Sequence, residues 1–142
     1  MKFNPNVWGP HYWYFLHTIA LTYPTHPNTI VKKRYYEFLT NLDLFLPDGK
    51  FAHYYKSLLR KYPLTPFLDN RRSLSKWMNF IHNKVNEKLE KKKVSLYDFY
   101  QQYEKLQNQH DEFHLSRLYK KFFFFFVSIS ILAIIIIFFY YK

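Results

Sequence analysis

Apolar residues recur at helical spacing along most of the chain, and prolines separate the periodic segments. In the first segment, Trp13, Leu16, His17 and Ala20 fall at i, i+3, i+4 and i+7, which places them on one helical face. The same period predicts helices over about 11–23, 29–45, 50–61, 74–92 and 96–106. No segment alternates cleanly with period 2, so the sequence predicts an all-α fold, a compact antiparallel bundle of short helices.

Side chains that can cap a helix stand at the start of several of these segments. Asn28 is the predicted N-cap of the helix over 29–45, and Ser73 is the predicted N-cap of the helix over 74–92. Asp48 lies in a Pro-Asp-Gly sequence that indicates a turn or a helix start. Ser95, with Asp98 three residues later, fits a capping box in its Asp variant and predicts the start of a short fifth helix.

A run of twenty residues, 122–141, contains no charge and only two clearly polar side chains, Ser128 and Ser130. As an α-helix it would span roughly 30 Å, the thickness of the hydrocarbon core of a bilayer. A buried core helix is the alternative, but a small domain seldom encloses a helix that is apolar on all sides. The sequence therefore predicts a helical domain (1–106), a polar and basic spacer (107–121) and a transmembrane helix.

The residues beside this run predict its orientation. Arg117, Lys120 and Lys121 precede it, and the positive-inside tendency then places the N-terminal domain in the cytosol. Tyr140 and Tyr141 suit an interfacial aromatic belt, and a single residue follows them. No apolar signal-peptide core opens the chain. These features predict a single-pass membrane protein with a C-terminal anchor.

The composition excludes several classes of protein. The 142 residues include no cysteine, which excludes a disulfide framework, a cysteine-ligated zinc site, an iron–sulfur cluster and a cysteine nucleophile. Two glycines, Gly9 and Gly49, are too few for a P-loop or a G-x-G-x-x-G turn. Lysine and arginine number 21 against 10 acidic residues, a net charge of +11, but they are dispersed. Without a nucleic-acid-binding motif, this charge predicts no specific nucleic-acid partner.

The predicted fourth helix carries two stripes of side chains. One repeats every four residues and indicates a core face: Trp77, Ile81, Val85 and Leu89. The other is polar and shares a second face: Asn79, His82, Asn83 and Asn86. The polar stripe is either a row of amides with an imidazole that binds a polar ligand, or a solvated face. The residues alone leave both readings open.

No metal site and no hydrolase triad is indicated. His17, His53 and His82 lack the close spacing that metal sites use, and no H-E-x-x-H motif occurs. No G-x-S-x-G elbow is present either. We therefore expect no bound metal.

Several short motifs follow one another at regular distances. They are Trp8-Gly9-Pro10, Trp13, Leu16-His17, Tyr23-Pro24, Leu46-Pro47, His53, Tyr62-Pro63-Leu64-Thr65, Trp77 and His82-Asn83-x-x-Asn86-x-x-Leu89. Together they resemble the Erv/ALR family of FAD-linked sulfhydryl oxidases, especially the compact versions of large cytoplasmic DNA viruses. The resemblance covers roughly residues 6–105.

The resemblance implies a four-helix bundle plus a short fifth helix, with FAD held at the mouth of the bundle, often in a homodimer. The family's FAD contacts correspond to Trp13, His17, Tyr23, Trp77, His82, Asn83, Asn86 and Lys88. This shifts the interpretation of the polar stripe towards ligand binding, since a buried nucleotide edge would satisfy its amides.

The chain departs from the family at the redox C-x-x-C, where the two cysteine positions are occupied by Asp48 and Phe51. Disulfide exchange requires a thiolate that attacks sulfur, so neither residue can relay electrons to a flavin. We expect a protein that keeps the fold and FAD but is weak or inactive alone, an accessory subunit that pairs with an active oxidase in a host or virion membrane. The alternatives are a working thiol oxidase that uses a partner's cysteines, and a non-flavin membrane scaffold.

Overall fold

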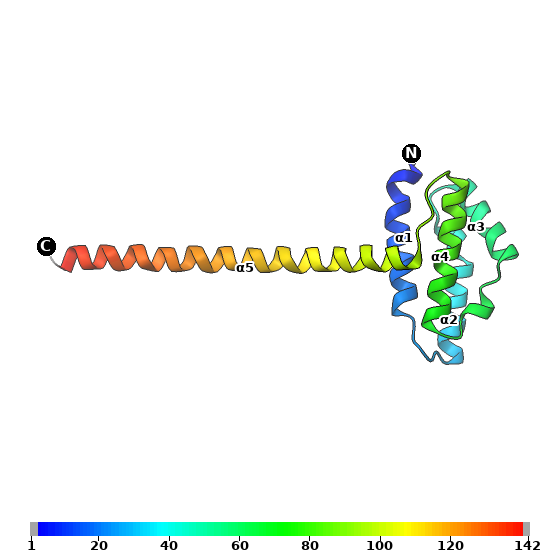
Figure 1. Cartoon of the computed structure of the whole chain (residues 1–142), viewed down its shortest axis with the longest axis horizontal. Helices are drawn as coiled ribbons and strands as arrows, with labels where there is room; N and C mark the ends of the chain where they lie inside the picture. The colour runs from blue at the N-terminus through cyan, green and yellow to red at the C-terminus, as the bar shows by residue number, and fades with distance from the viewer. Residues whose placement is uncertain (1–2, 141–142) are drawn as a thin grey trace. The chain divides into compact units, whose positions relative to one another are not determined.

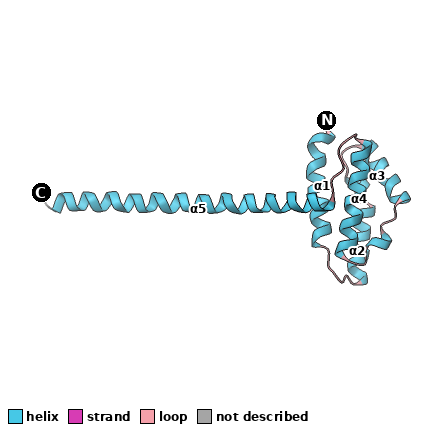
Figure 2. Cartoon of the chain, in the orientation of Figure 1, coloured by secondary structure: helices cyan, strands magenta, loops and turns pink. Residues whose placement is uncertain are grey.

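The computed structural model describes residues 3–140, including the side chains of all of these except 107 and 109–114, and over that range every regular element is a helix. The α-helices are α1 (Pro5–Thr22), α2 (Thr29–Thr40), α3 (Gly49–Lys61), α4 (Arg71–Lys88) and α5 (Leu96–Tyr140) (Figures 1 and 2). Two short 3₁₀ helices, η1 (Leu42–Phe45) and η2 (Thr65–Phe67), lie between them. The all-α prediction is confirmed. The helices α1–α4 form one compact unit, and α5 beyond Leu96 forms another.

The predicted N-cap residues of α2 and α3 are confirmed, and the predicted N-cap of α4 is wrong. Asn28 accepts the backbone N–H of Val31, and Asp48 accepts the N–H groups of Lys50 and Phe51, so both predicted caps are confirmed. The prediction for α4 is wrong by three residues. Asn70, not Ser73, is the N-cap, and its side chain accepts the Ser73 N–H at 2.9 Å.

Three helices also end or begin at positions other than the predicted ones. The first helix begins at Pro5, capped by Asn4, and includes Pro10. The second ends at Thr40 because the Asn41 side chain donates to the Glu37 carbonyl at 2.7 Å and the chain continues as η1. The fourth ends at Lys88, not near residue 92, because Glu90 adopts the left-handed conformation, with φ 55°.

The predicted short fifth helix does not end near residue 106. It is the first part of α5, which continues without a break for 45 residues, about 67 Å at 1.5 Å per residue. No proline or glycine occurs after Pro66, so α5 contains neither of the two residue types that most disfavour a helix interior. In the segment 107–121, eight of fifteen residues are glutamine, glutamate, leucine, arginine or lysine, which favour the helix even without packing.

One helical stretch of the described chain, Leu115–Tyr140, is long and apolar enough to cross a membrane, and none of it is buried. It contains nearly all of the predicted membrane helix. Tyr141, the last residue of that prediction, and Lys142 lie outside the described residues. The stretch is therefore a candidate membrane anchor by length and composition.

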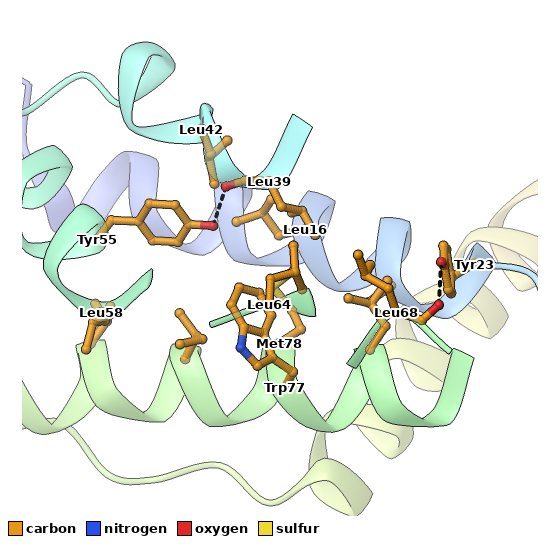
Figure 3. Close-up of a cluster of buried hydrophobic side chains, with 14 residues drawn as sticks. Leu16, Tyr23, Leu39, Leu42, Tyr55, Leu58, Leu64, Leu68, Trp77 and Met78 are labelled. Atoms are coloured by element: carbon orange, nitrogen blue, oxygen red, sulfur yellow. Dashed lines mark hydrogen bonds between the residues drawn. The ribbon is translucent and has the colours of Figure 1, made fainter. Parts of the chain in front are cut away.

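The core of the α1–α4 unit is a set of buried leucines and aromatic side chains from all four helices (Figure 3). Two tyrosine hydroxyls that enter this core are paired with backbone carbonyls. The Tyr55 hydroxyl donates to the Leu39 carbonyl and the Tyr23 hydroxyl to the Leu68 carbonyl, each at 2.8 Å (Figure 3). These bonds satisfy carbonyls near the end of α2 and beside η2 that water does not reach.

Removing the Tyr55 hydroxyl tests this pairing. We expect Tyr55→Phe to lower the free energy of unfolding by about 1–2 kcal/mol, because the buried Leu39 carbonyl loses its donor. Tyr36→Phe is the matched control, since Tyr36 is 42% exposed. Urea unfolding of the full chain in detergent measures both. Equal stability of the two variants would contradict the pairing.

Candidate functional site

Helices α1 and α4 bring three of the predicted site residues into one cluster. The Trp13 and His82 rings are stacked, with centroids 4.1 Å apart and planes 13° apart. His17 lies one turn after Trp13, and its Nε2 is 3.0 Å from Nδ1 of His82. Since residues four apart share a helix face, α1 presents Trp13 and His17 to His82 together.

Both histidines of this cluster are neutral at pH 7. Burial lowers the pKa of His17 to about 3, and the neighbouring His82 lowers it further. Burial also lowers the pKa of His82 to about 4, with a smaller contribution from the positive charge of Lys91. A 3.0 Å bond between neutral rings requires one nitrogen to donate and the other to accept. The pair therefore holds one proton between the helices.

The polar stripe of α4 does not act as a single unit. The Asn83 amide donates to the Val94 carbonyl at 2.8 Å and accepts the Val94 N–H, also at 2.8 Å. The Asn79 amide donates to the same carbonyl at 3.1 Å. Further along, the Lys91 ammonium donates to the Asn6 side chain on α1 at 2.9 Å. Asn79 and Asn83 thus clamp the segment after α4 against their own helix.

Asn86 differs from its neighbours on the stripe. It is 6% exposed, yet its side chain has no hydrogen-bond partner among the described residues, although its backbone carbonyl accepts the Lys91 N–H. Its amide atoms are not fully enclosed, so water or a ligand can bond to them. Of the stripe, Asn86 is the residue whose hydrogen-bonding groups remain available to a ligand.

The other predicted contacts lie in the core and at the end of α4. Tyr23 and Trp77 are buried, and their polar groups donate to the carbonyls of Leu68 and Tyr62. The Lys88 ammonium lies 4.6 Å from the Tyr54 ring centroid. Lys88 also borders an open cleft of about 580 Å³ whose other lining residues are Gly49, Lys50, His53, Tyr54 and Ser57.

Asp48 and Phe51, which the family resemblance places at the redox cysteine positions, lie at the start of α3, beside this cleft. Asp48 caps the helix, and the half-buried Phe51 ring meets the Trp8 ring edge-on at 5.7 Å. Trp8 meets Tyr12 at 5.1 Å in the same way. The indole N–H of Trp8 is buried and has no partner among the described residues. In the sequence, Trp8 is noticeable only as part of the W-G-P motif. Nothing in the sequence indicates that Lys91 bonds to Asn6 on α1.

Comparison with known proteins agrees with this geometry. The family model described as "Erv1 / Alr family" matches residues 10–123. The chain belongs to the Erv1/Alr family. Because it contains no cysteine, this member lacks the redox C-x-x-C.

Relatives of this Erv1/Alr chain are viral and cellular. It is 44% identical over 84 residues to a probable FAD-linked sulfhydryl oxidase of Acanthamoeba polyphaga mimivirus, a match that covers 58% of the chain and 59% of the relative. It is 34% identical over 97 residues to an FAD-linked sulfhydryl oxidase of African swine fever virus, covering 68% of the chain and 80% of the relative. The match to a mitochondrial relative from Schizosaccharomyces pombe, at 35% identity, spans 56% of the chain and 43% of that protein. The chain thus spans only about half the length of some of its relatives.

Solved structures confirm the fold. The FAD-binding domain of Erv1 from Saccharomyces cerevisiae is similar with a TM-score of 0.66 and 27% identity, covering 72% of this chain and 95% of that domain. The yeast Erv1 core is similar with a TM-score of 0.65 and covers 86% of that core.

The histidine pair makes stability depend on pH. Below about pH 6.5, both histidines are protonated in the unfolded chain but stay neutral in the folded protein. The free energy of unfolding therefore falls as the pH decreases towards the folded pKa values of about 3 and about 4. We expect a loss on the order of 2 kcal/mol per histidine between about pH 7.5 and pH 5. Denaturant unfolding of the full chain in detergent measures this slope.

The variant His17→Gln should flatten that pH dependence, because it removes one of the two shifted groups. His26→Gln is the matched control, since His26 lies in an exposed loop. If both variants keep the slope of the unchanged protein, the pair is not its source.

Proposed function

We propose that this chain is a membrane-anchored, FAD-binding member of the family that does not oxidise thiols by itself and acts as an accessory subunit of an active oxidase. The observation that carries the proposal is the structure of the first turn of α3. Asp48 caps the helix with two hydrogen bonds and Phe51 packs against Trp8. The turn keeps its fold although both positions have lost the chemistry of the relay.

The residues of the site fit FAD in part. Trp13 and His82, which stack on each other, offer aromatic surface to a planar ring, and the Asn86 amide offers a donor and an acceptor to a nucleotide edge. Lys88 offers a positive charge for the diphosphate. Asn83 fits less well, because its amide is already bonded to Val94. Bound FAD would supply a two-electron acceptor that oxygen can reoxidise.

The substitutions preserve the helix and remove the reactive groups. The positive end of α3 would stabilise a thiolate at residue 48, and it stabilises the Asp48 carboxylate in the same way. Asp48 also accepts hydrogen bonds from the backbone N–H groups of Lys50 and Phe51. A thiolate at this position would be a weaker hydrogen-bond acceptor for these groups. At residue 51, an aromatic ring extends the Trp8–Tyr12 contacts. Neither side chain can form or exchange a disulfide.

The proposed location follows from α5. Leu115–Tyr140 is long enough to cross a bilayer, and Arg117, Lys120 and Lys121 stand at its N-terminal end. The positive-inside tendency then favours the cytosolic side for the α1–α4 unit. The proposed partner is an active family member in the same membrane, which supplies the cysteines that this chain lacks.

Flavin binding is testable by absorbance of the full chain purified in detergent and loaded with FAD. We expect a bound flavin spectrum, and Asn86→Leu should weaken FAD binding about 10–100-fold, because a ligand group loses its hydrogen-bond partner. Asn108→Leu makes the same chemical change at an exposed position of α5 and should bind normally. Failure of the unchanged protein to retain any FAD would overturn this part of the proposal.

Restoring the cysteines tests the missing relay. The unchanged FAD-loaded chain should produce no peroxide from dithiothreitol above free flavin, whereas Asp48→Cys with Phe51→Cys should produce it continuously. Each single cysteine variant is a control, because a dithiol relay needs both sulfurs. Peroxide production by the unchanged chain would contradict its proposed inactivity. A flavin-loaded double variant without activity would show that more than the cysteines has been lost.

A further inference from the structure

Lysine side chains and aromatic rings are interleaved on the surface where α3 and α4 meet. The Lys61 ammonium lies over the Tyr62 ring, 5.5 Å from its centroid, and the Tyr62 ring meets the Phe80 ring edge-on at 4.8 Å. The Lys84 ammonium lies over the Phe80 ring, 5.7 Å from its centroid. These contacts form one continuous row from the end of α3 to the middle of α4.

The same surface continues past Lys84 to the cleft at the start of α3. The Tyr54 hydroxyl donates to the Lys84 carbonyl at 3.1 Å, and the Lys88 ammonium lies over the Tyr54 ring at 4.6 Å. Lys88 and Lys50 both border the cleft of about 580 Å³. We call this surface the lysine face and define it by its four cations, Lys50, Lys61, Lys84 and Lys88.

Most of the positive charge of the lysine face is unpaired. Glu87 pairs with Lys84 at 3.0 Å, and the other three lysines have no ion pair among the described side chains. No acidic residue lines the cleft. Asp48 precedes it, but its carboxylate already accepts two backbone N–H groups of α3. Unpaired cations gathered on one surface attract a partner that carries several closely spaced negative charges.

The ring contacts favour carboxylate groups over nucleic-acid bases as these negative partners. An ammonium group covers one face of each of the three rings, and the Tyr62 and Phe80 rings also contact each other. Base stacking needs the ring faces that these contacts occupy. A carboxylate needs only the ends of the lysines. Because the rings already hold these ends in place, binding costs less side-chain freedom.

The dimensions of the lysine face suit an extended peptide. Lys50 and Lys61 are separated by about 16 Å along α3, at 1.5 Å per residue. An extended chain covers that distance with about five residues, at roughly 3.3 Å per residue. The cleft beside Lys50 and Lys88 is concave, so a narrow chain can enter it and the surface of a bilayer cannot.

We propose that the lysine face is the docking surface for an extended polypeptide segment rich in aspartate and glutamate. In the proposed function this segment belongs to the active oxidase, and the inference rests on that function only for the identity of the partner. A segment docked in the cleft lies beside Asp48 and Phe51. It therefore brings the partner's own chain to the place where this chain lacks the cysteines.

A labelled acidic peptide tests the docking surface. Binding of fluorescein-labelled octaglutamate to the full chain, in nonionic detergent and without FAD, would be measured by fluorescence anisotropy. Lys50→Glu with Lys61→Glu reverses two charges of the face and leaves Lys88, which the proposed function assigns to FAD, unchanged. Lys33→Glu with Arg34→Glu is the matched control, because it makes the same change in net charge at exposed side chains of α2. Thermal unfolding checks that both variants fold.

We expect octaglutamate to bind the unchanged chain, and to bind less tightly as the salt concentration rises. Its affinity should fall at least about tenfold in the lysine-face variant and stay within about twofold in the control. Lys50→Gln with Lys61→Gln, which removes the two charges without reversing them, should lie between these values. No binding to the unchanged chain overturns the proposal. An equal loss in both charge-reversed variants also overturns it, since net charge alone would then explain the binding.

Two further measurements identify the partner class. Octathymidylate that binds as tightly as octaglutamate would overturn the assignment to an acidic polypeptide. The chain would also be reconstituted in phosphatidylcholine liposomes, with and without about one-third phosphatidylserine. If phosphatidylserine abolishes peptide binding, the bilayer occupies the face and the proposal is wrong. Because FAD is left out, failure to retain FAD overturns only the proposed function, and failure to bind the peptide overturns only the docking surface.

Discussion

The contact between α1 and α4 is the constraint on which the candidate site depends. It places Trp13 and His17 of one helix against His82 of the other. Burial keeps the hydrogen bond between the two histidine rings away from water. The same contact is reinforced away from the site, where the Ser75 hydroxyl donates to the Ala20 carbonyl at 3.3 Å. A shift of either helix would therefore break the histidine pair and the core packing together.

The first turn of α3 is stabilised by side chains that need no sulfur. A helix start needs a side chain that accepts its free N–H groups, and Asp48 meets that need better than cysteine. A position in the first turn that faces the core needs apolar area, which Phe51 provides against Trp8. The stability of this helix start therefore does not depend on a cysteine at either position.

Much of the fold was predictable because its signals are local. Asn28 and Asp48 cap helices through bonds to residues two or three positions away, and prolines separate the helices of the bundle. The sequence predicts Ser73 as the N-cap of α4, but Asn70 is the cap, because the backbone at Asn70 is extended and the helix begins at Arg71. The predicted fifth helix is too short because a polar composition alone does not distinguish a spacer from an exposed helix, and many of these residue types favour a helix.

By itself the sequence determined the helical class, the family motifs, the apolar stretch of α5 and the absence of sulfur, because each depends on residue type and spacing alone. Only the tertiary structure decided what the shared polar face of α4 does. Asn83 and Asn86 share one face of a helical wheel, but the segment after α4 bonds to Asn83 and leaves the Asn86 amide without a partner among the described residues. That difference arises from contacts between residues eleven positions apart, which no periodicity encodes.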